Sequence, residues 1–229
     1  MGLVVEATHL GLGHRVALKF LAEEMASDPT ALARFRREAQ ASAQLKSEHI
    51  CRVFDVGVEG KMPFIVMELL SGTDLARLAK VRKLDPATAA LYIRQACLGL
   101  AEAHAAQIVH RDLTPANLIV TRERRVRLID LGVGKSAIAE VETRTGQVMG
   151  SLGYMSPEQV MATGLDQKSD QFACAAILWE LFAGDRLIPI GQPAAVLART
   201  AHLEYRPLRK IHPRLPKKLD AVLARALAV

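Results

Sequence analysis

The chain has 229 residues, 50% of them hydrophobic and 24% charged, so it can bury a sizeable core as one large domain or two small ones. Its net charge of +6 and pI of about 9.4 suit an anionic partner, but with 4% aromatic residues a stacking surface for nucleic acid is not expected. No segment has the composition of a disordered chain, and no apolar run is long enough to span a membrane.

The cysteine spacing and the amino-terminal sequence predict the cellular compartment of the protein. Cys51, Cys97 and Cys174 are far apart and show no C-x-x-C spacing, which favours buried thiols in a reducing cytoplasm. The amino terminus lacks the charged-then-apolar order of a signal peptide. We therefore expect a cytoplasmic protein without a membrane segment in this chain.

The first third of the chain changes period quickly, as a small sheet with one helix does. Residues 3–7 and 15–20 are apolar runs around the turn-rich L-G-L-G-H, and they predict a hairpin. Asp28 and Pro29 form a helix start, and apolar residues recur at helical spacing as far as Ala43. Residues 50–56 and 64–69 predict two more strands, separated by a turn over residues 57–63.

From about Ser71 onward the pattern is mainly helical. Asp85 and Pro86 start an apolar helix that runs to about Ala106, and residues 167–182 form a second one, ended by Gly184. Between them, residues 108–109, 118–121 and 126–129 predict short strands around polar loops. The basic cluster T-R-E-R-R-V-R, residues 121–127, is interpreted as a solvated hairpin turn.

Three motifs carry chemistry. V-A-L-K, residues 16–19, ends a predicted strand; H-R-D-L-T-P-A-N, residues 110–117, fills a polar loop; D-L-G, residues 130–132, follows an apolar strand. They resemble, in order and context, the V-A-I-K, H-R-D-L-x-x-x-N and D-F-G motifs of eukaryotic-type protein kinases. Taken alone, the first motif is typical of surface charge and the third is typical of a turn. Their occurrence together with the second motif, in the family's order, is what supports the resemblance.

The resemblance implies an α+β, two-lobed fold with a small antiparallel-sheet N-lobe carrying one helix and a larger, mainly helical C-lobe. One kinase domain over residues 1–229 would place the N-lobe at about 1–69, the hinge at about 68–72 and the C-lobe at about 73–229. The family's first strand and last helix would be missing.

The catalytic residues implied by the resemblance are five. Lys19 would bind the α and β phosphates of ATP and pair with Glu38 of the following helix. Asp112 would accept the proton of the substrate hydroxyl, while Asn117 and Asp130 would bind Mg²⁺. Structural support would come from His110, Arg111, Gly132 and Asp170, the last by bracing the catalytic-loop backbone.

The adenine site is implied at the sheet and the hinge. The gatekeeper would be Met67, and the remaining ATP-binding positions would be Gly2, Val4, Ala17, Glu68, Leu70 and Ile119. Read singly, each apolar position is simply a core residue.

Between Gly132 and S-P-E lies a polar stretch with the length of an activation loop, ending in G-S-L-G-Y-M-S-P-E-Q. Ser151 stands where the family has a threonine that contacts the catalytic aspartate. Thr143 and Thr145 are candidate autophosphorylation sites, whose phosphates would bind arginines such as Arg111.

Departures from the family pattern concern both ends and the catalytic loop. Only the end of the glycine-rich loop is present, and the arginine that would pair with Glu158 is missing, so that carboxylate is expected to lack its family partner. Leu131 replaces the phenylalanine of D-F-G. Thr114 replaces a lysine, as in bacterial Hanks-type kinases.

Two functions remain open. The first is a protein kinase of bacterial type that uses ATP and Mg²⁺ to phosphorylate Ser or Thr of protein substrates in signal transduction. The second is a catalytically impaired, kinase-fold regulatory or binding module. No nucleic-acid partner is expected, and dimerisation for trans-autophosphorylation is left open.

Overall fold

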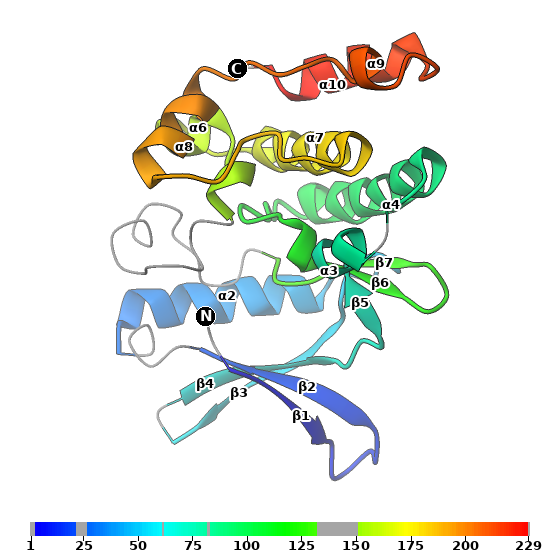
Figure 1. Ribbon diagram of the computed structural model, residues 1–229. Coiled ribbons are helices and arrows are strands. Elements are labelled where there is room, and N and C mark those ends of the chain that lie inside the picture. Colours follow the sequence, from blue (N-terminus) through cyan, green and yellow to red (C-terminus); the bar gives the residue numbers. More distant parts are fainter. Residues whose placement is uncertain (1–2, 22–26, 61, 82, 132–150, 229) are drawn as a thin grey trace.

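The computed structural model describes residues 3–21, 27–60, 62–81, 83–131 and 151–228. These residues form a smaller lobe around an antiparallel sheet and a larger, mainly helical lobe, stacked one above the other in Figure 1. The α+β, two-lobed fold expected from the motifs is confirmed.

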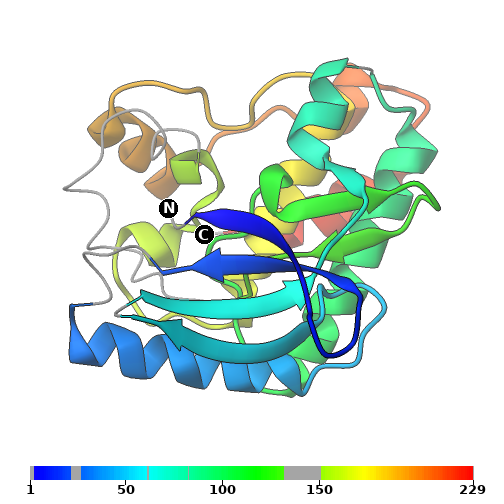
Figure 2. The same cartoon turned by 90° about the horizontal axis from the view of Figure 1, so that it is seen from below.

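The smaller lobe is a sheet with one helix against it. Its strands are β1 (Val4–Thr8), β2 (Arg15–Phe20), β3 (Val53–Glu59) and β4 (Met62–Glu68), in the order β1-β2-β4-β3 with antiparallel neighbours. Helix α2 (Pro29–Ala43) lies beside this sheet in Figures 1 and 2 and buries Phe35 and Ala39 against it. As predicted, α2 begins after Asp28, whose carboxylate accepts a hydrogen bond from Thr30 N at 2.8 Å.

The boundaries of β3 differ from the prediction. The strand was expected at residues 50–56 with a turn at 57–63, but it runs from Val53 to Glu59 and pairs Gly57 with Phe64. A Cβ on Gly57 would lie 2.4 Å from the Phe64 ring, so the glycine is there for this close approach and not for a turn. The chain reverses direction between β3 and β4 near Gly60, which has a φ of 62°.

The larger lobe contains a small sheet and several helices. Its strands are β5 (Gly72–Asp74), β6 (Leu118–Thr121) and β7 (Val126–Leu128), paired in that order. Its helices are α3 (Leu75–Val81), α4 (Pro86–Ala105), α6 (Pro157–Val160), α7 (Gln167–Ala183), α8 (Pro193–Ala201), α9 (Leu208–Ile211) and α10 (Lys217–Ala226), with 3-10 turns η1 (Pro115–Asn117) and η2 (Leu152–Tyr154).

Helix α7 is the centre of the larger lobe. It is apolar nearly all round, as a fully buried helix must be, and it packs against α4, α9 and α10. The Asp166 carboxylate caps its first turn, and Gly184 ends it with a φ of 75°. The predicted helix and its glycine stop are confirmed, and Asp170 in its first turn accepts hydrogen bonds from the backbone of His110 and Arg111.

The short strand predicted at residues 108–109 is wrong. Gln107 turns the chain with a φ of 61°, and Ile108 N donates to Ala103 O in the last turn of α4. That amide closes the helix and is no longer available to a sheet. In the described part of the chain, no helix has the length and apolarity needed to cross a membrane.

Candidate active site

The smaller-lobe sheet presents its predicted nucleotide-binding residues on one face. The strand register sets Val4 opposite Lys19, Lys19 opposite Ile65 and Ala17 opposite Met67. Directly paired residues, and residues two apart on a strand, project to the same side. The sequence V-A-L-K therefore sends Ala17 and Lys19 toward the larger lobe.

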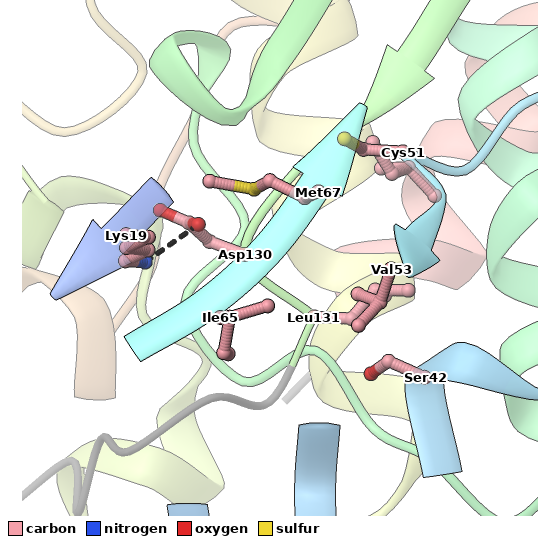
Figure 3. A pocket seen from close by; sticks show the side chains of 9 residues that line it. Lys19, Ser42, Cys51, Val53, Ile65, Met67, Asp130 and Leu131 are labelled. Carbon is pink, nitrogen blue, oxygen red and sulfur yellow. Dashed lines mark ion pairs between the residues drawn. The ribbon is translucent and has the colours of Figure 1, made fainter. Parts of the chain in front are cut away.

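Lys19 meets Asp130 across the two lobes. The ammonium Nζ lies 2.6 Å from Asp130 Oδ1, and both side chains are largely removed from water. Figure 3 marks this ion pair with a dashed line. Asp130 has a φ of 64°, a left-handed backbone that is unfavourable for a residue with a Cβ and clusters at functional sites. The end of V-A-L-K and the start of D-L-G thus form one charged pair.

The H-R-D-L-T-P-A-N loop is held closed by its own polar groups. Asn117 Nδ2 donates to Asp112 O at 2.7 Å, and Ile129 N donates to Asn117 O at 3.0 Å. The buried His110 ring has Nε2 3.0 Å from Ile129 O. These contacts put Asn117 and Asp130, the two predicted Mg²⁺ ligands, on adjoining strand ends.

Asp170, on the first turn of α7, supports the backbone of the same loop. Its side chain is 1% exposed; Oδ2 accepts from His110 N at 2.8 Å and Oδ1 from Arg111 N at 2.9 Å. His104 Nε2 of α4 lies 2.7 Å from Oδ2. Because Arg111 has a φ of 68°, this carboxylate holds a strained turn in place directly before Asp112.

A small cavity of about 20 Å³ separates the Lys19–Asp130 pair from α2. Figure 3 shows Met67, Ile65, Leu131 and Ser42 around it. The Ser42 hydroxyl is buried and has no hydrogen-bond partner among the described atoms. Burial also raises the pKa of the Cys51 thiol, which lines the same cavity, to about 12, so this thiol stays protonated and unreactive at neutral pH.

The predicted hinge begins at Glu68, the last residue of β4. Glu68 O accepts a weak hydrogen bond from Cys51 Sγ at 3.6 Å, and the Glu68 carboxylate forms an ion pair with Arg127 of β7. The interpretation of residues 121–127 as a solvated turn needs correction at this point. Residues 122–125 are exposed, but Arg127 is half-buried beneath the hinge.

The segment after the predicted activation loop is tied to the catalytic loop by Gln159. Its Nε2 donates to Arg111 O at 2.6 Å, and its Oε1 accepts from Ser156 N at 3.0 Å. Ser169 Oγ donates to Glu158 Oε1 at 2.5 Å, so this carboxylate has a hydrogen-bond partner, while its lack of the family's arginine stays a prediction.

For some of the predicted site residues, the contacts described above do not test the predicted role. Gly2, Gly132, Thr143 and Thr145 lie outside the described residues. The pairing of Glu38 with Lys19, and the roles of Ser151, Leu70 and Ile119, stay predictions. Val4 shares the face of Lys19 but is 54% exposed.

Sequence reasoning missed Arg127, which pairs with Glu68 of the predicted hinge, and Gln159, which donates to Arg111 O in the H-R-D-L-T-P-A-N loop. A signal for Arg127 was present, since V-R-L alternates apolar, basic and apolar residues as a half-buried strand does. Gln159 carried no such signal, because one glutamine in a short helix has no pattern of its own.

Comparison with known proteins agrees with this geometry. The chain is 35% identical over 229 residues to the serine/threonine-protein kinase PknA of Mycobacterium tuberculosis, covering 97% of this chain and 52% of PknA. It is 34% identical over 230 residues to the serine/threonine-protein kinase PknB of Mycolicibacterium smegmatis, covering 37% of that protein. The chain thus spans about half or less of the length of these curated relatives.

Solved structures give the same family. The crystal structure of the Mycobacterium tuberculosis PknI kinase domain superposes with a TM-score of 0.77 at 28% identity, covering 100% of this chain and 83% of that one. The family model described as the protein kinase domain matches residues 1–223. With that match over nearly its whole length, the chain belongs to the protein kinase domain family.

Proposed function

We propose that this chain is an active serine/threonine kinase domain, which transfers the γ-phosphoryl group of Mg-ATP to Ser or Thr hydroxyls of proteins. The observation that carries the proposal is the 2.6 Å contact between Lys19 Nζ and Asp130 Oδ1. It joins a cation suited to phosphates and a carboxylate suited to Mg²⁺ at the junction of the lobes. The names of PknA and PknB support serine/threonine specificity.

Asp112 is the proposed base. The substrate hydroxyl oxygen forms a bond to the γ-phosphorus while the bond from that phosphorus to the bridging oxygen breaks, and ADP leaves with the electron pair. The hydroxyl proton passes to the Asp112 carboxylate. Asn117 and Asp170 hold the loop on either side of this residue, so the carboxylate is aimed before the substrate arrives.

The donor set beside Asp112 fits Mg²⁺. Asn117 uses its amide nitrogen on Asp112 O, which leaves its carbonyl oxygen for a cation, and Asp130 adds a carboxylate on the adjoining strand end. When bound, Mg²⁺ supplies positive charge against the phosphate oxygens. Across the described residues there is no cluster of three or more His, Cys, Asp or Glu side chains, so a dedicated all-protein metal cage is not part of the proposal.

The adenine would lie between Ala17 and Ile119, with Met67 closing the inner end and the backbone at Glu68 to Leu70 binding its edge. Ala17 is buried and small, so the ring can approach the sheet closely. Phosphates on Thr143 or Thr145 would order the activation loop through Arg111. Protein substrates, dimerisation and a cytoplasmic location belong to this proposal.

The test is transfer of labelled γ-phosphate from Mg-ATP to the chain itself and to a generic protein substrate. Asp112→Asn should abolish labelling, because the base is lost, but should leave nucleotide binding intact. Asp185→Asn, at an exposed aspartate of the same lobe, is the matched control and should label normally. Nucleotide binding without any label on Ser or Thr in the unaltered protein would replace the proposal with the regulatory module.

A further inference from the structure

One basic residue outside the motifs joins the two lobes beneath the hinge, residues 68–72. The guanidinium of Arg127, in the middle of β7, forms an ion pair with the carboxylate of Glu68, at the end of β4. The exposed fractions are 17% for the Arg127 side chain and 32% for Glu68. Partial burial makes this pair less screened by solvent than an ordinary surface pair.

The strand register explains why Arg127 points at the hinge. Arg127 pairs directly with Ile119 of β6, and directly paired residues project to the same side of a sheet. Its neighbours Val126 and Leu128 project to the other side and are fully buried in the core of the larger lobe. Arg127 therefore shares the face of Ile119, the proposed floor of the adenine site.

Glu68 is fixed through its backbone and its side chain together. Its N–H donates to Arg52 O at 2.9 Å, and its carbonyl accepts from Cys51 Sγ. Cys51 is itself attached to β7, because Cys51 N donates to Leu128 O at 2.8 Å. Backbone and thiol contacts thus hold the Glu68 main chain. Its carboxylate is oriented by the Arg127 guanidinium and by a longer hydrogen bond from Arg52 N, at 3.4 Å to Oε2.

The Arg127 guanidinium depends on Glu68 for its charge pairing. Its Nε is buried and has no hydrogen-bond partner among the described residues, so the guanidinium is desolvated on one edge and relies on Glu68 on the other. Removing either partner leaves a half-buried charge without its counterion, which is strongly unfavourable. The hinge strand and β7, which leads directly to Asp130, are thereby linked.

We propose that Arg127 is a positioning residue for nucleotide binding, which holds Glu68 so that the backbone of residues 68–70 meets the adenine edge in a fixed orientation. The inference rests on the proposed function, since it concerns how the same site binds ATP. Arg127 does not touch the phosphates in this scheme, so it acts on affinity and not on the transfer step.

The experiment compares Arg127→Met with Arg125→Met. Arg125 lies on the same hairpin and pairs with Glu48, but both of those side chains are more than half exposed, so it is a matched control for charge and location. Mg-ATP affinity, the KM and kcat of phosphate transfer, and amide hydrogen exchange of residues 68–70 in the nucleotide-free protein are measured for both variants.

The expected result is a rise of about tenfold in the Kd and KM for Mg-ATP in Arg127→Met, with kcat within about twofold of the unaltered protein. Amides 68–70 should exchange faster in this variant and not in Arg125→Met. Glu68→Gln should reproduce the loss, and the double variant should be no weaker than either single one. Arg127→Lys, which keeps the charge, should recover part of the affinity and serves if Arg127→Met does not fold.

The outcomes separate the two proposals. Unchanged affinity in folded Arg127→Met, or in Glu68→Gln where Arg127→Met does not fold, overturns the positioning role alone when the unaltered protein binds normally. An equal loss in Arg125→Met also overturns it, because general charge would then be the cause. No nucleotide binding by the unaltered protein refutes the proposed function, and the positioning role falls with it.

Discussion

Replacement of Asp170 should damage the catalytic loop without touching any residue that faces the substrate. The carboxylate accepts from two backbone amides, His110 N and Arg111 N, at 2.8 and 2.9 Å and is 1% exposed. Asp170→Ala leaves both amides buried without an acceptor. At about 1–3 kcal/mol for each of the two buried unsatisfied donors, the free energy of unfolding should fall by about 2–6 kcal/mol.

A loss of that size is a large part of the stability of a typical domain, about 5–15 kcal/mol, so the milder Asp170→Asn is the more informative variant. Its single amide oxygen can serve one of the two backbone donors, and its NH₂ group must face the other. We expect a loss of about 1–3 kcal/mol and faster hydrogen exchange at the unsatisfied amide. Asp166→Asn is the control, because Asp166 caps the same helix from an exposed position and asparagine caps equally well.

The assay is urea unfolding combined with amide exchange resolved at His110 and Arg111. Phosphate transfer should also fall in Asp170→Asn, since the loop directly before Asp112 loses one of its two anchors. If Asp170→Asn folds with the urea midpoint of the unaltered protein and both amides exchange at the unaltered rate, the bracing argument is wrong.

Three further predictions follow from single positions. Ser42→Ala removes a buried hydroxyl that has no partner in the described part of the chain, so it should stabilise the protein by about 1 kcal/mol in urea unfolding; a loss of stability would contradict this. Hydrogen bonding from Thr88, through its side chain and then its backbone N–H, holds the pKa of the Asp85 carboxyl below its ordinary range. The stability that this carboxylate contributes is therefore present above the ordinary pKa and is lost as pH falls through the folded-state pKa. Asp85→Asn should therefore show a shallower fall in melting temperature between about pH 5 and pH 3, and equal slopes would refute the argument. Gly99→Ala would place a Cβ 2.7 Å from Leu128 Cδ1, so we expect a loss of about 1–3 kcal/mol by urea unfolding, and an unchanged midpoint would show that the core yields there.

The chain alone determined the features that depend on near neighbours. Asp28 with Pro29 and Asp85 with Pro86 start helices because capping needs only the first turn, and Gly184 ends α7 because only a left-handed residue is required there. The motifs identified the family for a similar reason, since each is a short run of residue types. Strand boundaries were less certain, because the limits of β3 depend on the ring of Phe64 in another strand.

Only the tertiary structure decided which distant groups meet. Lys19 reaches Asp130 because the strand register turns its side chain toward the larger lobe. Arg127 looked like part of a solvated turn, yet pairing with Ile119 aims it at Glu68. Such contacts join residues far apart in the chain, so they are set by the register of strands and the packing of lobes and leave no local pattern to read.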